Sequence, residues 1–455
     1  IFFRVCMPLS GLEPLPTYGS EVWLVLGAYF VVLAVVGVWS WRRTKTLTHT
    51  SSGANEDLKH HYLAGGSLGR LITSASTMAS LFSGYTVIGI PAESSSTGYV
   101  ACRWVGGILS IVWALMAVAP RIQFLAHRRN YLSTLDFLKD RYLHEGEVAS
   151  LLLALVVFAV ALPMYIYVVG QFKAFAGSIT GMSNGAVPSW MSSVTLATAL
   201  VIYETLGGLT AVAATDVVQG GILALGALAM LWYTFTLFGG MSEISTRLPP
   251  HLTATMDGAG CLSWLNFFLL TLSYPFFPHL MTRMMAAKEP ATYRFALYCL
   301  AVSPLFLTFA SVLVGLAAIS VTGAGEELGH GAFTTFLGYV VASGPVGRAV
   351  GAVCLSVSVA AIMSSTDSLL IALAQTVTLD ILQPLVPTIG THRLLTAGKV
   401  VSVIIAFVSV FVAETGMDLS FLVLLQSAFL IQTAPAYLLG MYWRGARAMG
   451  IVAGL

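Results

Sequence analysis

Charged side chains are scarce in this sequence. Only 9% of its 455 residues are Asp, Glu, Lys or Arg, whereas 57% are hydrophobic, and the mean hydropathy is +0.85. A soluble globular domain carries about 25% charged residues. Apolar runs of about 20 residues, long enough to cross a bilayer, recur from one end of the sequence to the other. This composition excludes an ordinary soluble protein and predicts an all-α polytopic membrane protein.

Several chemical signatures are absent as well. No HExxH or GxxxxGK motif occurs, so the sequence offers neither a zinc-protease helix nor a nucleotide-binding loop. The net charge of +2 and the lack of a basic cluster give no reason to expect a nucleic-acid partner. We therefore expect no enzyme activity and no cofactor. The cysteines form no CxxC pair and no metal-binding spacing, so we interpret them as packing residues. They are Cys6, Cys102, Cys261, Cys299 and Cys354.

The hydrophobic segments define a topology that the basic residues can test. If the chain crosses the bilayer at each segment, 17 of its 22 Lys and Arg residues lie on one side and 5 on the other. Lys and Arg are enriched in cytoplasmic connections. We therefore expect the N-terminus outside and the loop 42–66 in the cytoplasm, in a multi-pass protein of the plasma membrane. We predict spans at about 22–41, 68–99, 104–125, 147–178, 188–206, 209–238, 262–286, 292–322, 350–381, 394–413 and 417–442, with another beginning near residue 447.

Two of these spans contain helix-breaking residues at mid-membrane depth. The second holds Gly84 and Pro91, and the seventh holds Pro275 and Pro278. Proline removes a backbone donor, and unwound backbone in a membrane is tolerated only where it lines a cavity or is buried by protein. The two breaks lie five spans apart, so the halves have opposite orientations, which is typical of an inverted-repeat secondary transporter.

The predicted breaks divide the chain into regions. We expect an N-terminal helix and cytoplasmic loop over residues 1–66 and a transporter core over residues 67–443. Within the core, the inverted repeats cover about 67–238 and 262–443. Residues 444–455 begin a further helix, which the sequence truncates.

The ninth span carries the densest group of polar side chains, from Ala361 to Ser368. On a helix Ala361, Ser364 and Ser365 share one face, and Ser364, Asp367 and Ser368 repeat that spacing further around. Polar groups inside a membrane usually mark an ion or substrate path, and hard cations prefer oxygen ligands. The hydroxyls have two interpretations. They line a cation site, or they bond back to carbonyls one turn earlier in the same helix. Asp367 favours the cation site, since a carboxylate is not satisfied so easily.

A second buried acid lies about two turns into the sixth span. Asp216 is either paired with a buried partner or acts as a cation ligand or inner-gate charge near Asp367. We prefer the functional alternative, because an ionisable group within a membrane span is costly.

Together these motifs resemble the sodium/solute symporter family, which includes proline, pantothenate, monocarboxylate and sugar cotransporters. The match begins near residue 20, and its most specific segments are 207–219 and 361–380. The resemblance implies a LeuT-like 5+5 inverted-repeat core with an extra N-terminal helix, and about 12–13 transmembrane helices in the full protein. It also implies sodium-coupled symport of a small organic solute by alternating access. Na+ would be the coupling ion and the only metal.

The resemblance extends to individual residues. Sodium would bind the carbonyls of Ala79, Phe82 and Ala361 and the hydroxyls of Ser364 and Ser365. A second cation site, present in some members, would use Asp216, Asp367 and Ser368. The solute would lie between the two broken spans, near Ser83, Gly84, Tyr85, Gln171, Tyr274, Phe277 and Gln426.

The broken helices also indicate the class of solute. The N-terminus of a half-helix favours an anionic group, so we expect an amino acid, a monocarboxylate or a related acid. Leu81 stands where the proline carriers have an acidic residue, which argues against proline itself. Two alternatives remain. One is a proton-coupled transporter of the same fold, with Asp216 and Asp367 as carriers, and the other is a transport-inactive membrane sensor or channel-like protein.

Overall fold

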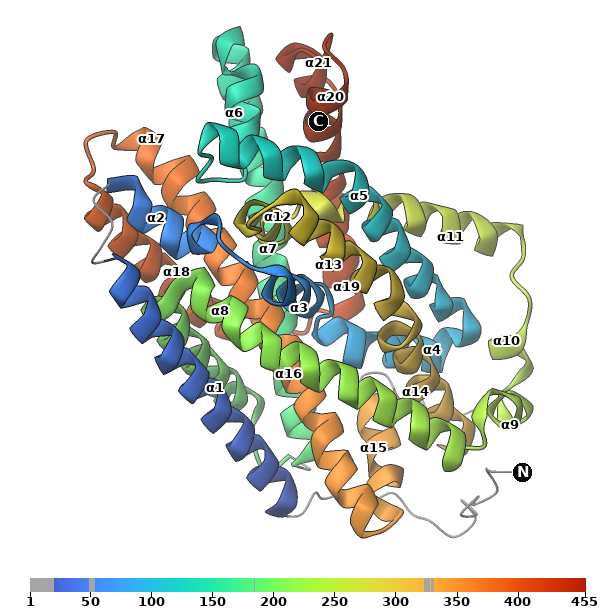
Figure 1. Ribbon diagram of the computed structural model, residues 1–455. Coiled ribbons are helices and arrows are strands. Elements are labelled where there is room, and N and C mark those ends of the chain that lie inside the picture. The colour runs from blue at the N-terminus through green and yellow to red at the C-terminus, as the bar shows by residue number, and fades with distance from the viewer. Residues whose placement is uncertain (1–19, 49–53, 184, 323–327, 329–330) are drawn as a thin grey trace.

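The computed structural model describes residues 20–48, 54–183, 185–322, 328 and 331–455. Within these ranges the regular structure is helical, apart from one isolated bridge between Leu68 and Ala287. Nine helical stretches of the described residues are long and apolar enough to cross a membrane. Figure 1 shows them as long, tilted helices packed side by side. Residues 1–19 and 49–53 of the predicted N-terminal region, and Cys6 with them, lie outside the described residues.

The first half of the chain is built from α1 (Ser20–Thr48), α2 (Ala54–Leu63), η1 (Ala64–Gly66), α3 (Arg70–Leu81), η2 (Tyr85–Gly89), α4 (Ile90–Thr97), η3 (Gly98–Cys102), α5 (Arg103–Arg129), α6 (Asp136–Tyr142), α7 (Glu147–Met182) and α8 (Ser189–Thr236). The second half adds α9 (Gly240–Arg247), α10 (Pro250–Thr253), α11 (Gly258–Thr271), η5 (Tyr274–Phe276), α12 (Pro278–Ala286), α13 (Pro290–Val302), α14 (Leu307–Thr322), α15 (Ala332–Ala342), α16 (Pro345–Gln375), η8 (Thr376–Leu382), α17 (Gln383–Leu385), α18 (Thr391–Ala413), α19 (Leu419–Ile431), α20 (Ala434–Tyr442) and α21 (Ala448–Val452).

The predicted spans correspond to these helices, although their boundaries differ in two places. The fifth and sixth spans are the two arms of α8, which bends at Gly208. Gly208 has a φ of 56°, and a Cβ there would lie 2.6 Å from the backbone oxygen of His61. Only glycine combines that conformation with that approach. The outer half of the second span continues through η3 into α5, so one apolar stretch runs from residue 85 to residue 129.

Both predicted helix breaks are present. α3 ends at Leu81, and Phe82 is extended before the π-helical turn η2 begins. In the seventh span, α11 gives way to the 3-10 turn η5, and Phe277 is extended before α12 begins. Each break therefore frees backbone groups in the interior of the bundle, as the Gly and Pro positions predicted.

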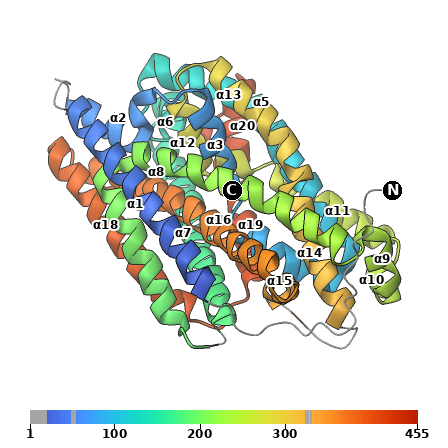
Figure 2. The ribbon, with the colours of Figure 1, turned by 60° about the horizontal axis from the view of Figure 1, so that its bottom comes forward.

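α16 lies at the centre of the bundle. Every residue from Cys354 to Gln375 is buried, which requires protein on all sides of the helix. Its neighbours include α1, α3, α7, α8, α15 and α18, and Figure 2 shows α16 running beside α1 and α8. The polar residues 361–368 therefore face other helices rather than lipid.

Candidate functional site

The predicted sodium ligands begin with a junction between α3 and α16. The hydroxyl of Ser364 lies 2.8 Å from the carbonyl oxygen of Ala79 on α3 and 3.1 Å from that of Ala361 on its own helix. In an unbroken helix the amide of Ser83 would bond Ala79, but here it bonds the hydroxyl of Thr86 at 3.2 Å. The break thus frees the Ala79 carbonyl. Three oxygens converge, and one hydroxyl hydrogen serves them.

The next residue supplies a further oxygen. Ser365 is fully buried, and its hydroxyl has no hydrogen-bond partner of good geometry. The hydroxyl of Tyr167 interacts with both Ser365 and Ser83. Phe82, the extended residue that follows α3, is also fully buried, and its carbonyl belongs to the predicted set of ligands. Buried polar atoms are nearly always paired, so a set of carbonyl and hydroxyl oxygens with too few donors fits a hard cation.

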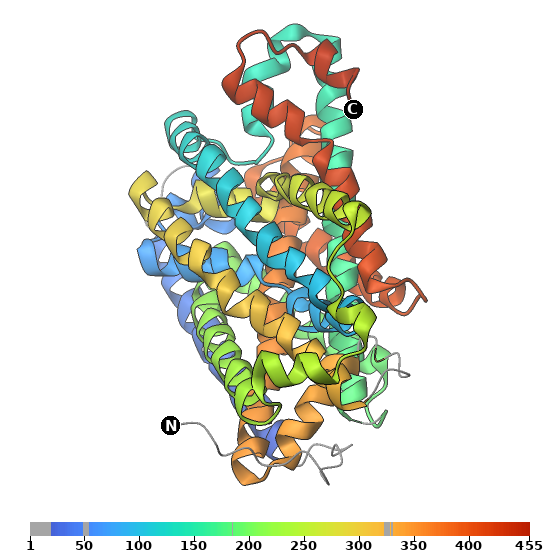
Figure 3. The same cartoon turned by 90° about the vertical axis from the view of Figure 1, so that its right-hand side faces the viewer.

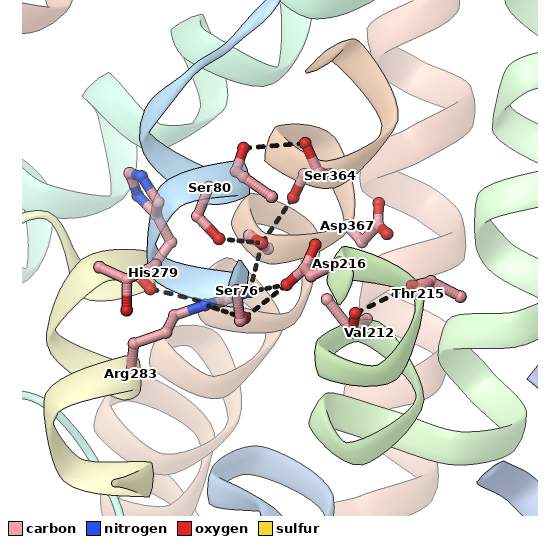
Figure 4. A network of polar contacts seen from close by, with 12 residues as sticks. Ser76, Ser80, Val212, Thr215, Asp216, His279, Arg283, Ser364 and Asp367 are labelled. Carbon is pink, nitrogen blue, oxygen red and sulfur yellow. Dashed lines mark hydrogen bonds and ion pairs between the residues drawn. The ribbon is translucent and has the colours of Figure 1, made fainter. Parts of the chain in front are cut away.

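The other polar face of α16 meets a buried arginine. Arg283 on α12 is fully buried, and its Nη2 lies 3.5 Å from Oδ2 of Asp216 and donates to Ser368. Figure 4 shows Arg283 and Asp216 converging on Ser76, whose hydroxyl lies 2.5 Å from Asp216 and 3.3 Å from the Arg283 Nε. Arg283 is one of the 17 basic residues expected on the cytoplasmic side, but it is buried inside the bundle on α12 and does not lie in a loop. It is the buried partner that one of the two alternatives for Asp216 required.

Asp367 turns away from this arginine group. Its Oδ2 accepts a hydrogen bond from the hydroxyl of Tyr203, in the first arm of α8. Oδ1 of Asp367 and Oδ1 of Asp216 are both buried without a hydrogen-bond partner. Ser368 bonds the hydroxyl of Ser80 at 3.0 Å in addition to Arg283. Asp216, Asp367 and Ser368, predicted for a second cation site, are thus neighbours. However, Asp216 and Ser368 both contact the guanidinium of Arg283.

The second helix break is lined with rings. Phe277 has its ring centroid 5.3 Å from that of Tyr274, 5.8 Å from that of Tyr167 and 5.2 Å from that of His279. Tyr274 bonds the hydroxyl of Ser427 on α19 at 3.0 Å. On the same helix Oε1 of Gln426 is buried without a partner, as is Nδ1 of His279. Tyr274, Phe277 and Gln426, all predicted near the solute, therefore lie at one aromatic cluster. Two buried polar atoms of this cluster have no hydrogen-bond partner.

The predicted solute residues at the first break have partners within the protein. Oε1 of Gln171 accepts the amide of Gly84 at 2.9 Å, and a Cβ at Gly84 would lie 2.5 Å from Cγ1 of Ile362. The hydroxyl of Ser83 accepts the amide of Tyr85 at 3.2 Å. The Tyr85 hydroxyl points to Glu93, 3.1 Å away. Gln171 and Ser83 therefore stabilise the break, and the Tyr85 hydroxyl is paired with Glu93.

The inner ends of the two broken helices are clamped together. Leu68, before α3, donates to the carbonyl of Ala286 and accepts from the amide of Lys288, both at 3.0 Å. Gln123 and His127 of α5 reach the carbonyl of Ala287 at 3.2 and 3.0 Å. These contacts join the two broken helices at the end of the molecule that the basic residues predict to be cytoplasmic.

Several residues of the site were missed by sequence reasoning. The spacing of Ser76 and Ser80, four apart on α3, could have placed both on one face. Arg283 follows the second break by one helical turn, which could have indicated burial. Tyr203 and Tyr167 carry no local signal, because each meets the site only through tertiary packing.

The whole chain is similar to known transporters. A family model described as "Sodium:solute symporter family" matches residues 61–455. The osmoregulated proline transporter OpuE of Bacillus subtilis (strain 168) is 25% identical over 454 residues, covering 96% of this chain and 86% of the relative. A sodium/proline symporter of Staphylococcus aureus (strain JH9) is 25% identical over 457 residues, covering 96% and 84%.

Two solved structures share the fold. A Na+-coupled sialic acid symporter, in a substrate-bound outward-open state, matches with a TM-score of 0.75 at 19% identity, over 96% of this chain and 89% of that one. MhsT in complex with L-phenylalanine matches with a TM-score of 0.56 at 13% identity, over 85% and 92%. This likeness confirms the predicted fold class, an all-helical, LeuT-like transporter core.

Proposed function

This chain belongs to the sodium:solute symporter family, and from that premise we propose that it carries a small organic acid, an amino acid or a monocarboxylate, together with Na+ by alternating access. One observation carries the proposal. The hydroxyl of Ser364 joins the freed carbonyl of Ala79 on α3 to that of Ala361 on α16, at a break in a membrane helix. Sodium-coupled carriers in this fold place their sites at such breaks, near the membrane midplane.

We assign the coupling sodium to the oxygens of the α3–α16 junction. Its ligands are the carbonyls of Ala79, Phe82 and Ala361 and the hydroxyls of Ser364 and Ser365. An ion there holds α3 and α16 together, so it stabilises the conformation in which that junction is intact. Coupling follows because a ligand shifts a conformational equilibrium by its difference in affinity for the two states.

The test compares serines of one helix. Ser364→Ala removes the bridging hydroxyl, whereas Ser358→Ala removes a buried hydroxyl that bonds only the Leu355 carbonyl of α16 itself. Uptake is measured in proteoliposomes with an imposed sodium gradient. We expect Ser364→Ala to raise the sodium concentration for half-maximal uptake about tenfold, equivalent to ~1.4 kcal/mol, and Ser358→Ala to leave it unchanged. Identical sodium activation in both variants contradicts the site.

The aromatic cluster at the second break is our proposed solute site. Tyr274, Phe277 and Gln426 supply rings and an unpaired amide oxygen, and α12 begins there with no side chain capping its N-terminus. An uncapped helix N-terminus attracts a carboxylate. Ser83, Gly84, Tyr85 and Gln171 complete the proposed set from the first break. Two similar proteins are named as proline transporters, which favours an amino acid, although Leu81 argues against proline itself.

A second cation between Asp216 and Asp367, with Ser368 beside it, is a separate proposal. It is supported by the two carboxylate oxygens without hydrogen-bond partners. A proton at the same place is the alternative, because two buried carboxylates that lie close together disfavour simultaneous ionisation. Uptake driven by an imposed pH gradient in sodium-free medium distinguishes proton coupling from sodium coupling.

The remaining proposals concern organisation. We propose inverted repeats over about 67–238 and 262–443, an N-terminal region over 1–66, and a further helix that begins within 444–455. The positions of the two breaks, five spans apart, support the repeats. We also propose an outside N-terminus in the plasma membrane, which the distribution of Lys and Arg supports.

A further inference from the structure

Three arginines surround a cavity far from the transport site. Arg121 on α5, Arg141 on α6 and Arg444, just after α20, line a cavity of about 470 Å³ together with residues 440–443. Figures 1 and 3 show α6, α20 and α21 projecting from one end of the helix bundle. The inner ends of the broken helices lie toward the same end of the molecule. No acidic side chain among the described residues lines the cavity.

Two of these guanidinium groups are held in place by backbone carbonyls. Arg141 donates to the carbonyls of Gly440, Arg444 and Ala446 at 3.3, 3.2 and 2.9 Å. Arg121 donates to the carbonyl of Met441 at 2.7 Å. Carbonyl oxygens orient a guanidinium but carry no net charge. The cavity is therefore built around fixed positive groups.

The positive charge of the cavity has no acidic counterpart in the described part of the chain. None of the three arginines forms an ion pair with a described Asp or Glu. Glu145, close to Arg141 in sequence, accepts the amide of Ala448 instead. Arginines without carboxylate partners are suited to bind a phosphate group, because the paired N–H donors of a guanidinium fit phosphate oxygens.

The depth of the cavity follows from α5. Arg103 begins this helix and pairs with Glu93 at 2.9 Å. Arg121 lies 18 residues further on, and no charged residue stands between them. At about 1.5 Å per residue this separation is about 27 Å, close to the ~30 Å hydrocarbon thickness of a bilayer. Arg121 and the cavity therefore lie at the level of the lipid headgroups on the side opposite Arg103.

Aromatic residues at the cavity support the same depth. Tyr442 and Trp443 have exposed fractions of 51% and 59%, and the guanidinium carbon of Arg121 lies 3.9 Å from the centroid of the Tyr442 ring. Exposed Trp and Tyr are enriched at the membrane interface. A free anion in solution needs no such belt, whereas a lipid places its phosphate at this level and its acyl chains beside the rings.

We propose that this arginine cavity binds the phosphate-bearing headgroup of an anionic lipid. Basic pockets between membrane helices on the cytoplasmic side bind such headgroups. The lipid would join α5, from the first half of the chain, to the segment after α20, from the second half. This proposal is independent of the sodium and solute sites.

Binding is tested on the purified full chain by native mass spectrometry with phosphatidylglycerol or phosphatidylcholine. The variant is Arg121→Gln/Arg444→Gln, which leaves Arg141 to hold residues 440–446. Arg128→Gln is the matched control, because Arg128 is exposed on the same helix but does not line the cavity. We expect phosphatidylglycerol to bind the native chain, and the double variant to lose about twenty-five-fold in affinity, about fivefold for each arginine. The control should change less than about twofold.

Three results overturn the proposal: equal binding of phosphatidylcholine, an equal loss in Arg128→Gln, or displacement of the lipid by millimolar inorganic phosphate. Equal binding of phosphatidylcholine would show that the lipid charge does not matter. An equal loss in Arg128→Gln would show that the overall positive charge of this surface, and not the cavity, attracts the lipid. Displacement by phosphate would indicate a site for free anions. Should the double variant fail to fold, Arg444→Gln alone is compared with Arg128→Gln in the same assay, and its loss must exceed that of the control.

Discussion

The two polar faces of α16 begin within one helical turn of each other, yet their partners differ in kind. The face with Ser364 and Ser365 meets the carbonyl oxygen of Ala79 on α3, and it contains more acceptors than donors. The face with Ser368 meets the guanidinium of Arg283, which also serves Asp216. One face therefore presents neutral oxygens, whereas the other contains the permanent positive charge of Arg283. Similar spacing in a membrane helix can thus produce either an ion site or a structural network, and the tertiary partner decides.

The largest effect should come from the face that contains its own cation. Arg283→Gln leaves the carboxylate of Asp216 buried without a counter-charge, and a broken buried ion pair costs about 3–5 kcal/mol. We expect a loss of that size in the free energy of unfolding, measured in mixed detergent micelles. Asp216→Asn combined with Arg283→Gln should recover part of it. If Arg283→Gln alone has the same free energy of unfolding as the native chain, Arg283 does not stabilise the fold through Asp216 and Ser368.

Ser368 and Ser365 provide a matched pair across the two faces. The hydroxyl of Ser368 serves Arg283 and Ser80, so Ser368→Ala should lower the free energy of unfolding by about 1–3 kcal/mol. Sodium activation of uptake should remain near that of the native chain. A variant that keeps full stability and loses sodium activation would move Ser368 from the structural face to the ion site.

Ser365→Ala should give the opposite pattern. Its hydroxyl has no hydrogen-bond partner of good geometry, so its removal should change the free energy of unfolding by less than about 1 kcal/mol. The sodium concentration for half-maximal uptake should rise about tenfold. The comparison between the faces fails if Ser365→Ala and Ser368→Ala behave alike in both assays.

A change in stability as small as that of Ser365→Ala is expected at Asp367. Asn at this position keeps an oxygen to accept from Tyr203, so the free energy of unfolding should change by less than about 1 kcal/mol. If a second sodium binds between Asp216 and Asp367, the Hill coefficient of sodium activation should fall to one in Asp367→Asn. A native Hill coefficient that survives this substitution excludes Asp367 as a ligand.

Local chemistry explains which parts of the fold could be predicted. Gly84 and Pro278 lie beside polar residues inside apolar spans, and that combination made both breaks visible in the sequence, whereas Pro120 and Pro163 lie inside continuous helices. The hydroxyls of the ninth span were visible for the same reason, because they interrupt an apolar run. Their partners were not visible. Tyr203 and Asp367 are 164 residues apart, and no local pattern brings them together.

Arg283 shows the same limit more directly. A basic residue near the predicted end of a span looks like a loop charge, because Lys and Arg gather in cytoplasmic connections. The break shortens the second part of the seventh span to α12, and this places Arg283 inside the bundle against α3 and α16. Arg283 can be buried because it pairs with Asp216. Asp216 lies on α8, far away in the sequence, so no local pattern showed the pair.

Direct sodium binding to the purified chain tests the α3–α16 site without any dependence on the solute. Equilibrium binding of radioactive sodium is compared among the native chain, Ser364→Ala and Ser358→Ala. We predict saturable binding that weakens about tenfold or more in Ser364→Ala and remains unchanged in Ser358→Ala. Equal affinity in all three proteins would contradict the assignment of the coupling sodium to the junction of Ala79, Ala361 and Ser364.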